Sequence, residues 1–357
     1  MRTTTLQIRF NSPAFLGNAD QNGQWRTPPI KALLRQWWRV AFAMQNGFRV
    51  RENEMRHIEG RLFGHAWLDD DVDETGAKVH ARRGAVRIRL ARWDLGRLKT
   101  WEGLEQRTVH HPEAERARHQ VGPHAYLGYG PLDGRNGTRF EKRNAAIQAD
   151  ESNVLSLAYP EEDAPLIEHA LWLMDRYGTL GGRSRNGWGS FSLCTAQGGP
   201  ALAGRVPLRP WRDCLGLDWP HALGSDAKGA PLIWHTAPND DWRSLMRTLA
   251  DIKIRLRTTA FEFPRERPDG EIHDRHWLSY PVTTHKVRAW DRENLRLPNS
   301  LRFKLRPISQ TARVGVIFHV PCLPSATFRP DRQTIESVWQ RVHQFLDNRQ
   351  DLTRIPE

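Results

Sequence analysis

Apolar and polar residues alternate with a period of two in several short segments of the chain, over residues 6–10, 86–90, 252–257 and 301–306. Such alternation places apolar side chains on one face of a strand and polar side chains on the other. In the last three segments the polar positions are mostly Arg or Lys. The pattern predicts sheets whose apolar face is covered by helices and whose other face is exposed and basic. A further apolar strand is expected over residues 191–195.

Apolar residues spaced three and four apart predict helices between these strands. The first helix is expected to begin at Thr27, a good N-cap residue that is followed by Pro28. Its buried stripe is predicted to contain Ile30, Leu33, Leu34, Trp37 and Ala41. Further helices are expected over residues 164–177, 240–249 and 331–347.

These elements follow the order strand, helix, strands, helix, strand up to about residue 196, and the second half repeats that order in a less defined form. A strand–helix–strand–strand–helix–strand unit is the ferredoxin-like arrangement. We therefore predict an α+β protein of two tandem ferredoxin-like (RRM-like) domains with loop insertions. The domains are expected at residues 1–197 and 241–357, joined by a Pro- and Trp-rich connecting segment, 198–240. Polar segments 69–78 and 130–143 are predicted to be the insertions.

The segment LGGRSRNGWGSF, residues 180–191, carries the most specific chemistry in the chain. Glycine allows positive φ and close approach of the backbone, and successive N–H groups in such turns bind anions. Arg183 and Arg185 add planar guanidinium groups that suit phosphate. Trp188 offers a ring on which a base could stack, although packing against its own sheet is an equal alternative. The loop is thus predicted to bind a nucleic-acid backbone.

Composition supports a polyanionic partner and a cytoplasmic location. The 53 Lys and Arg residues outnumber the 41 Asp and Glu residues, which leaves a net charge of +12. Mean hydropathy of −0.66 and the lack of a spanning apolar run exclude an integral membrane protein. The polar start of the sequence predicts no signal peptide. Three widely spaced cysteines, Cys194, Cys214 and Cys322, are typical of a reducing compartment and give no zinc motif.

Lys31, Arg35 and Arg39 stand at i, i+4 and i+8 of the first predicted helix, so they share one face. We hypothesise that this face meets the glycine-rich loop across a groove that holds a ribose-phosphate chain. The alternative is an ordinary solvated face. Trp37 is expected in the core, whereas Trp38 lies between the apolar and cationic faces.

Two of these passages resemble the RAMP superfamily of CRISPR RNA-binding proteins. They are FNSPAFLGNADQNGQWRTPPIKALLRQWWR, residues 10–39, and GGRSRNGWGSF, residues 181–191. More narrowly, they are similar to the first-numbered RAMP subunits of type III-B Cmr effector complexes. In that family a strand leads to a glycine turn, an arginine, and a helix with a lysine, an arginine and paired tryptophans. The matching positions are Gly17, Arg26, Lys31, Arg35, Trp37 and Trp38, while Ala32 replaces a common glycine; segments 61–64 and 125–130 also look like family elements.

The resemblance implies two tandem ferredoxin-like domains and a non-catalytic subunit. It implies that the chain holds the 3′ part of the CRISPR RNA, helps to engage complementary target RNA, and contacts other RAMP subunits in antiviral defence. We expect no cofactor, no metal site and no catalytic residue. Combined with the reasoning from the residues, it predicts RNA contacts from Arg26, Lys31, Arg35, Trp38, Arg39, Gly181, Gly182, Arg183, Ser184, Arg185, Asn186, Gly187 and Trp188.

Two other functions remain open. RAMP-type endoribonucleases use a His-centred, metal-free site, for which His57, His110, His111 and His124 are the candidates, or an Asp with a divalent metal, for which Asp20 and Asp71 are the nearest analogues. An assembly protein with little RNA contact could use the Trp-rich passage 211–234 as an exposed interface.

Sequence motifs for small-molecule cofactors are absent. The chain has no Walker loop and no dinucleotide-binding glycine motif. The acidic run that begins at Asp69 has Glu74 where a calcium loop requires glycine, and the histidines at 110–124 follow no ligand spacing.

Overall fold

The computed structural model describes residues 1–66, 72, 75–78, 80–105, 107–116, 120–134, 137–141, 146–195, 202–264, 270–282 and 285–356. The chain forms two compact units, each built from three stretches. Unit 1 comprises Met1–Lys99, Asn144–Gly182 and Gly189–Pro207, and unit 2 comprises Thr100–Arg143, Arg183–Trp188 and Leu208–Glu357. This division differs from the predicted domains, because residues 100–143 and 183–188 pack with the C-terminal part of the chain.

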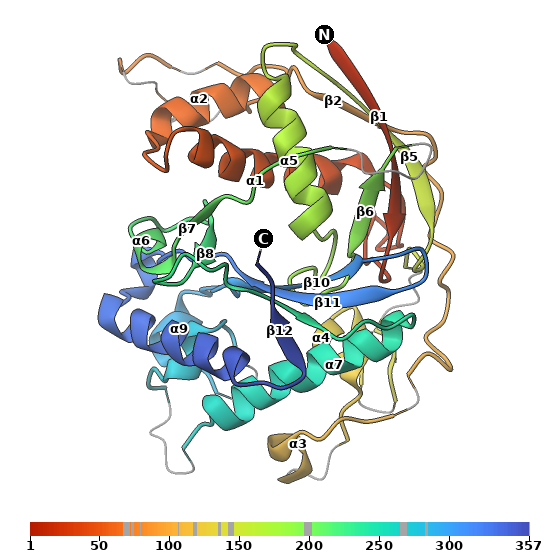
Figure 1. The fold of residues 1–357 in the computed structure, drawn as a ribbon, viewed down its shortest axis with the longest axis vertical. Coiled ribbons are helices and arrows are strands. Elements are labelled where there is room, and N and C mark those ends of the chain that lie inside the picture. The colour runs from red at the N-terminus through yellow and green to blue at the C-terminus, as the bar shows by residue number, and fades with distance from the viewer. Residues whose placement is uncertain are drawn as a thin grey trace. The chain divides into compact units, whose positions relative to one another are not determined.

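A four-stranded antiparallel sheet forms the centre of unit 1 (Figure 1). Its strands β1 (Arg2–Phe10), β2 (Arg87–Leu90), β5 (Ser152–Tyr159) and β6 (Phe191–Cys194) lie in the order β2-β5-β1-β6. The alternation in β1 buries Leu6, Ile8 and Phe10 and leaves Arg9 exposed. Leu6 lies opposite Leu155 of β5, so apolar rows continue from strand to strand.

Three helices supply the rest of the unit 1 core: α1 (Thr27–Gln45), α2 (Glu52–Phe63) and α5 (Ala164–Tyr177). Figure 1 shows α1 and α5 packed against the sheet. Helix α1 begins where predicted, although its N-cap is Arg26 and not Thr27. Trp37 contacts Tyr177 of α5 at a ring distance of 5.9 Å, which joins the two helices.

Unit 2 contains a second four-stranded antiparallel sheet with the same chain order. Strands β9 (Ile233–Thr236), β10 (Leu301–Pro307), β11 (Arg313–His319) and β12 (Leu352–Arg354) lie in the order β10-β11-β9-β12. Helices α7 (Trp242–Arg255) and α9 (Arg332–Asp347) follow β9 and β11 respectively. In Figure 1 both helices lie along this sheet. The α+β class and the strand–helix repeat in both halves agree with the prediction.

Smaller elements complete unit 2. Helix α4 and the hairpin β3-β4 lie between residues 123 and 140, and helix α8 precedes β10. The bounds of these elements are α3 (Pro112–Arg116), α4 (Pro123–Gly128), β3 (Leu132–Asp133), β4 (Arg139–Phe140), β7 (Leu208–Pro210), α6 (Trp211–Cys214), β8 (Leu223–Ser225) and α8 (Arg288–Arg292). Short helical turns occur at Leu256–Ala260, Asp274–Trp277 and Ala326–Phe328.

Several predictions about local structure were wrong. Residues 252–255 end helix α7 and 256–257 begin a π-helical turn, so the alternation there is not a strand. A helical stripe of buried apolar residues explains why this stretch is helical and not a strand; it consists of Leu245, Met246, Leu249 and Ile252. On β10 the basic face is not exposed, since Lys304 is buried and Arg302 is half-buried.

The connecting segment and the insertions also differ from expectation. Residues 208–236 contain β7, α6, β8 and β9, and within this passage Trp211 and Trp234 are buried. They are therefore core residues of unit 2 and not an exposed interface. Within 130–143, Leu132 and Asp133 are buried in the hairpin. Half of the predicted insertion 69–78, including Asp71, lies outside the described residues.

Within the part of the chain that the structure describes, every helix is too short or too polar to cross a membrane.

Candidate RNA-binding loop

The glycine-rich loop divides between the units: Gly181 and Gly182 belong to unit 1, and residues 183–188 belong to unit 2. In unit 1, Gly181 is required by close backbone approach. A Cβ on Gly181, whose φ is +91°, would lie 2.6 Å from the carbonyl oxygen of Phe15. The N–H of Gly182 donates to that same oxygen at 2.9 Å. The prediction that this N–H faces an anion was therefore wrong, because the N–H already donates to a carbonyl oxygen within the protein.

Within unit 2 the loop is held by Asn186. Its Nδ2 donates to the carbonyl oxygen of Leu127 in α4 at 2.7 Å, and its Oδ1 accepts from Nζ of Lys253 in α7 at 2.7 Å. The N–H of Phe303 in β10 donates to the carbonyl oxygen of Arg185 at 3.0 Å. The loop is thus fixed to two helices and a strand. Asn186 was predicted to contact RNA, but both ends of its amide are engaged within the protein.

Two N–H groups of the loop are also used within the loop itself. The N–H of Asn186 donates to the carbonyl oxygen of Arg183 at 2.9 Å, and that of Gly187 donates to Ser184 at 3.1 Å. These bonds close a tight turn in which Arg183 adopts a φ of +55°, an uncommon conformation for a residue with a side chain. The N–H groups of Asn186 and Gly187 are therefore not free to bind an anion.

Three cations gather at this turn without a carboxylate partner. Among the described residues, Arg183, Arg185 and Lys253 take part in no ion pair; Arg185 donates only to the carbonyl oxygen of Asn299, at 3.4 Å. Burial lowers the pKa of both arginines. Burial, followed by the charges of Arg257 and Arg183, lowers the pKa of Lys253 to about 7. Positive charge that the protein does not neutralise favours an anion from outside.

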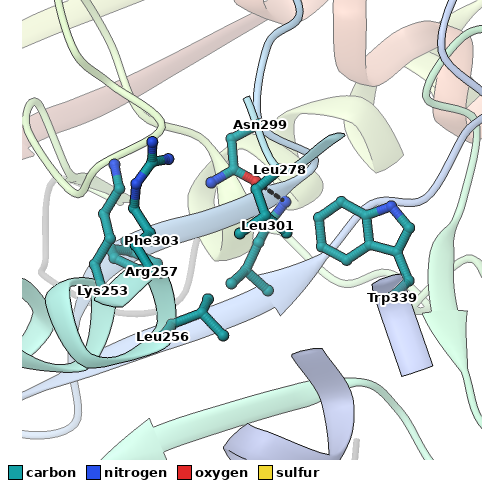
Figure 2. A pocket seen from close by; sticks show the side chains of 8 residues that line it. All are labelled: Lys253, Leu256, Arg257, Leu278, Asn299, Leu301, Phe303 and Trp339. Carbon is teal, nitrogen blue, oxygen red and sulfur yellow. Dashed lines mark hydrogen bonds between the residues drawn. The ribbon is translucent and has the colours of Figure 1, made fainter. Parts of the chain in front are cut away.

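A small cavity beside the loop does not hold a ligand of nucleotide size. It is lined by Lys253, Leu256, Arg257, Leu278, Asn299, Leu301, Phe303 and Trp339. Figure 2 shows Lys253 and Arg257 leaving their helix in the same direction, with Asn299 bonded to the N–H of Leu301 at 2.9 Å. The free volume is about 10 Å³, which is roughly the room for one water. A phosphate must therefore bind outside, where Arg183 is exposed.

Two of the three cations on the predicted face of α1 share one carboxylate within unit 1. Arg35 and Arg39 both donate to Oε1 of Glu59 in α2 at 2.6 Å, and Arg39 also reaches Oε2 at 2.9 Å. Glu59 is 2% exposed, and although burial raises its pKa, the bonds from Arg35 and Arg39 produce a net lowering. The α1 pattern alone did not show that a carboxylate from the next helix would lie against this face.

The other predicted contacts in unit 1 are mixed. Lys31 is half-exposed, and Arg26 donates to the carbonyl oxygen of Gly17, so it braces the turn before α1. Because Lys31 lies in unit 1 and Arg183 in unit 2, their convergence on one RNA strand stays a prediction.

Neither predicted tryptophan offers a surface to a base. Trp38 is fully buried, with Phe42 and Phe63 at ring distances of 5.1 and 5.9 Å. Trp188 is fully buried in a cluster with Trp101 at 5.4 Å and Trp242 at 6.1 Å. Both were expected to contact RNA, and both are core residues instead.

An exposed aromatic residue that the sequence analysis did not single out lies in unit 2. Tyr129 is 51% exposed at the end of α4. The signal for it was the Gly-Tyr-Gly run at 128–130, where a large ring stands between two residues without side chains.

The alternative nuclease residues differ in their accessibility. His57, His110 and Asp20 are exposed, and Nδ1 of His110 lies 2.7 Å from Oε1 of Glu115. His111 and His124 are buried, and burial lowers the pKa of His124 to about 4. Among the described residues no three His, Cys, Asp or Glu side chains gather as metal ligands would.

Comparison with solved structures finds similar chains with low identity. Apo Cmr1 from Pyrococcus furiosus is 14% identical, with 99% of this chain and 98% of that chain covered and a TM-score of 0.46. A chain of the type III-B Cmr-beta complex bound to cognate target RNA is 11% identical, with 95% and 99% covered and a TM-score of 0.46. A chain of that complex with target RNA, AMPPnP and single-stranded DNA is 10% identical, with 95% and 98% covered and a TM-score of 0.44.

A search of curated proteins finds no match to this sequence. The family model of the RAMP superfamily, in contrast, matches residues 7–192, which is more than half of the chain. That match includes the end of β1, all of α1 and α5, and the glycine-rich loop, so the chain belongs to the RAMP superfamily.

Proposed function

We propose that this protein is a non-catalytic RNA-binding subunit of a type III-B CRISPR effector complex. In this role it holds the 3′ part of the CRISPR RNA and helps to engage the complementary target RNA, together with other RAMP subunits in the cytoplasm. Membership of the RAMP superfamily supports the broad class. The narrower assignment rests on the resemblance of residues 10–39 and 181–191 to first-numbered Cmr subunits.

The observation that carries RNA binding is the cation group at the loop. Arg183 and Arg185 lie on a turn that Asn186 fixes in place, Lys253 of α7 donates to that asparagine, and no described carboxylate neutralises the three cations. An RNA strand supplies phosphates at regular spacing, and an exposed guanidinium held at a fixed point binds one of them with little loss of side-chain entropy. We propose no catalytic role for this chain.

We also propose that each unit is a ferredoxin-like domain. The support is the shared topology: in chain order, both sheets place the third strand between the first and second, and the fourth outside the first. Residues 100–143 and 183–188, which come from the first half of the chain, are then loop segments that pack with the second ferredoxin-like domain and not with the first.

Salt-dependent binding of single-stranded RNA tests the proposal. The variant Arg183→Gln/Arg185→Gln is compared with Arg87→Gln/Arg89→Gln, which removes the same charge from exposed positions of β2. Each lost phosphate contact lowers the log–log salt slope by about 0.7, so the loop variant is expected to lose up to about 1.4. Equal slopes in both variants, with native circular dichroism, would refute the loop as the RNA site.

A cleavage assay tests the non-catalytic part of the proposal. The purified chain is incubated with labelled guide and target RNA, with and without magnesium. We expect intact RNA in both. Specific cleavage that disappears in His57→Ala, His110→Ala or Asp20→Ala, the three exposed candidates, would assign the chain to the nucleases instead.

A further inference from the structure

The surface next to the loop carries an aromatic ring that the proposed phosphate site does not use. Tyr129 follows directly on α4 and is 51% exposed, whereas most aromatic side chains of unit 2 named above are buried. Proteins that bind single-stranded nucleic acids often place an exposed aromatic ring beside a cation. The ring stacks on a base and the cation contacts the phosphate.

Arg183 lies against the residue that follows this tyrosine. An ideal Cβ on Gly130, whose φ is +112°, would be 3.4 Å from Nη2 and 3.7 Å from Nε of Arg183. The missing side chain therefore leaves the space in which the guanidinium rests.

The element that carries Tyr129 is rigid. Asn186 bonds the carbonyl oxygen of Leu127, two residues before Tyr129, and so ties the end of α4 to the loop that bears Arg183. At Gly128 a Cβ would lie 2.8 Å from the Leu132 side chain and 3.1 Å from Nε1 of Trp188. The helix end is thus packed closely on the core, and the backbone at Tyr129 is held near the loop that bears Arg183.

We propose that Tyr129 is a stacking platform for one RNA base, whose adjoining phosphate is bound by Arg183. This inference rests on the proposed function and adds to it the part of the nucleotide that the site recognises. Stacking on a tyrosine requires no particular base, so the platform would bind single-stranded RNA with little sequence preference. An exposed tyrosine also suits a protein partner, but the cations beside it have no carboxylate partner among the described residues, which favours the polyanion.

The test measures RNA affinity and its salt slope for Tyr129→Ala, Tyr129→Phe and a control. Trp93→Ala is the matched control, because it removes an aromatic ring that is 50% exposed in the other unit. We expect Tyr129→Ala to bind about tenfold more weakly with an unchanged slope, since a base contact and no phosphate contact is lost. Tyr129→Phe keeps the ring and should bind within about twofold of the wild type.

Photocrosslinking of the unmodified chain to 5-iodouridine-substituted RNA gives an independent measurement that does not depend on a variant folding. The expected adduct maps to Tyr129. The proposal is overturned if Tyr129→Ala binds like Trp93→Ala, if Tyr129→Phe is as weak as Tyr129→Ala, or if adducts map elsewhere. Loss of binding in the loop variant together with wild-type binding in Tyr129→Ala would reject the platform and keep the RNA-binding function. Absence of RNA binding by the wild-type chain would reject both.

Discussion

Removal of the Asn186 amide should destabilise unit 2 and loosen the cation site at once. In Asn186→Ala, Lys253 loses the acceptor of its ammonium group and the carbonyl oxygen of Leu127 loses a donor. A hydrogen bond to a charged group contributes about 1.5–3 kcal/mol and a neutral one about 0.5–1.5 kcal/mol. Since both bonds are partly buried, we expect a loss of about 2–4 kcal/mol in the free energy of unfolding.

The cost should depend on pH in a defined direction. Burial lowers the pKa of Lys253 to about 7 in the folded protein, whereas an unfolded lysine titrates near pH 10.4. The unfolded chain therefore binds this proton more tightly, and the contribution of Lys253 to stability rises from about pH 7 to about pH 10. Asn186 supports the charged form, so its removal should cost more at pH 6 than at pH 9.

Urea denaturation at both pH values measures the two effects, with RNA affinity of the folded variant as the functional readout. The control is Asn46→Ala, whose exposed side chain makes one 2.9 Å bond to the carbonyl oxygen of Phe42, and we expect it to cost about 1 kcal/mol or less. The stabilising role of the two Asn186 hydrogen bonds is refuted if Asn186→Ala loses no more free energy of unfolding than this control, or if it loses more at pH 9 than at pH 6.

Three further variants test other parts of the structure. Glu59→Gln should lower stability by about 3 kcal/mol at pH 7, because it leaves two arginines with a neutral partner. Its difference from wild type, followed by urea denaturation, should vanish as the pH falls through the folded pKa of Glu59, which the bonds from both arginines hold below the ordinary value in spite of burial. Trp188→Ala should cost about 3–5 kcal/mol in the same assay and leave the RNA salt slope unchanged. Gly189→Ala should yield no folded protein, because its Cβ would lie 1.8 Å from the carbonyl oxygen of Leu180 at a φ of +64°; soluble protein with wild-type stability would contradict the backbone path.

The sequence predicted most of the framework because its signals are local. Strand alternation identified β1, β2 and β10, and helical spacing identified α1, α5 and α9 within a few residues. The stretch 252–257 misled because two periods overlap there: it alternates, yet Leu249 and Ile252 also continue a helical stripe that packs within unit 2. Local pattern does not reveal which period the tertiary contacts will select.

The site was predicted in part for the same reason. Arg183 and Arg185 could be identified because the glycines around them indicate a tight turn. Whether the other predicted contact residues are exposed, paired or buried depends on residues that are distant in the sequence. Only the folded structure brings Lys253 to Asn186, and Glu59 to Arg35 and Arg39. Burial of Trp188 likewise follows from Trp101 and Trp242, which no short motif contains.

The interleaved path of the chain has a consequence for biosynthesis. Trp101 and Trp188 leave the ribosome well before Trp242, the third ring of their cluster. At about 5–20 residues per second, Trp242 is synthesised about 3–10 s after Trp188. During that interval two large indoles lack their final cover, while the last residues of unit 1 have just been made. Nascent chains stalled in this window should therefore be preferred clients of holdase chaperones.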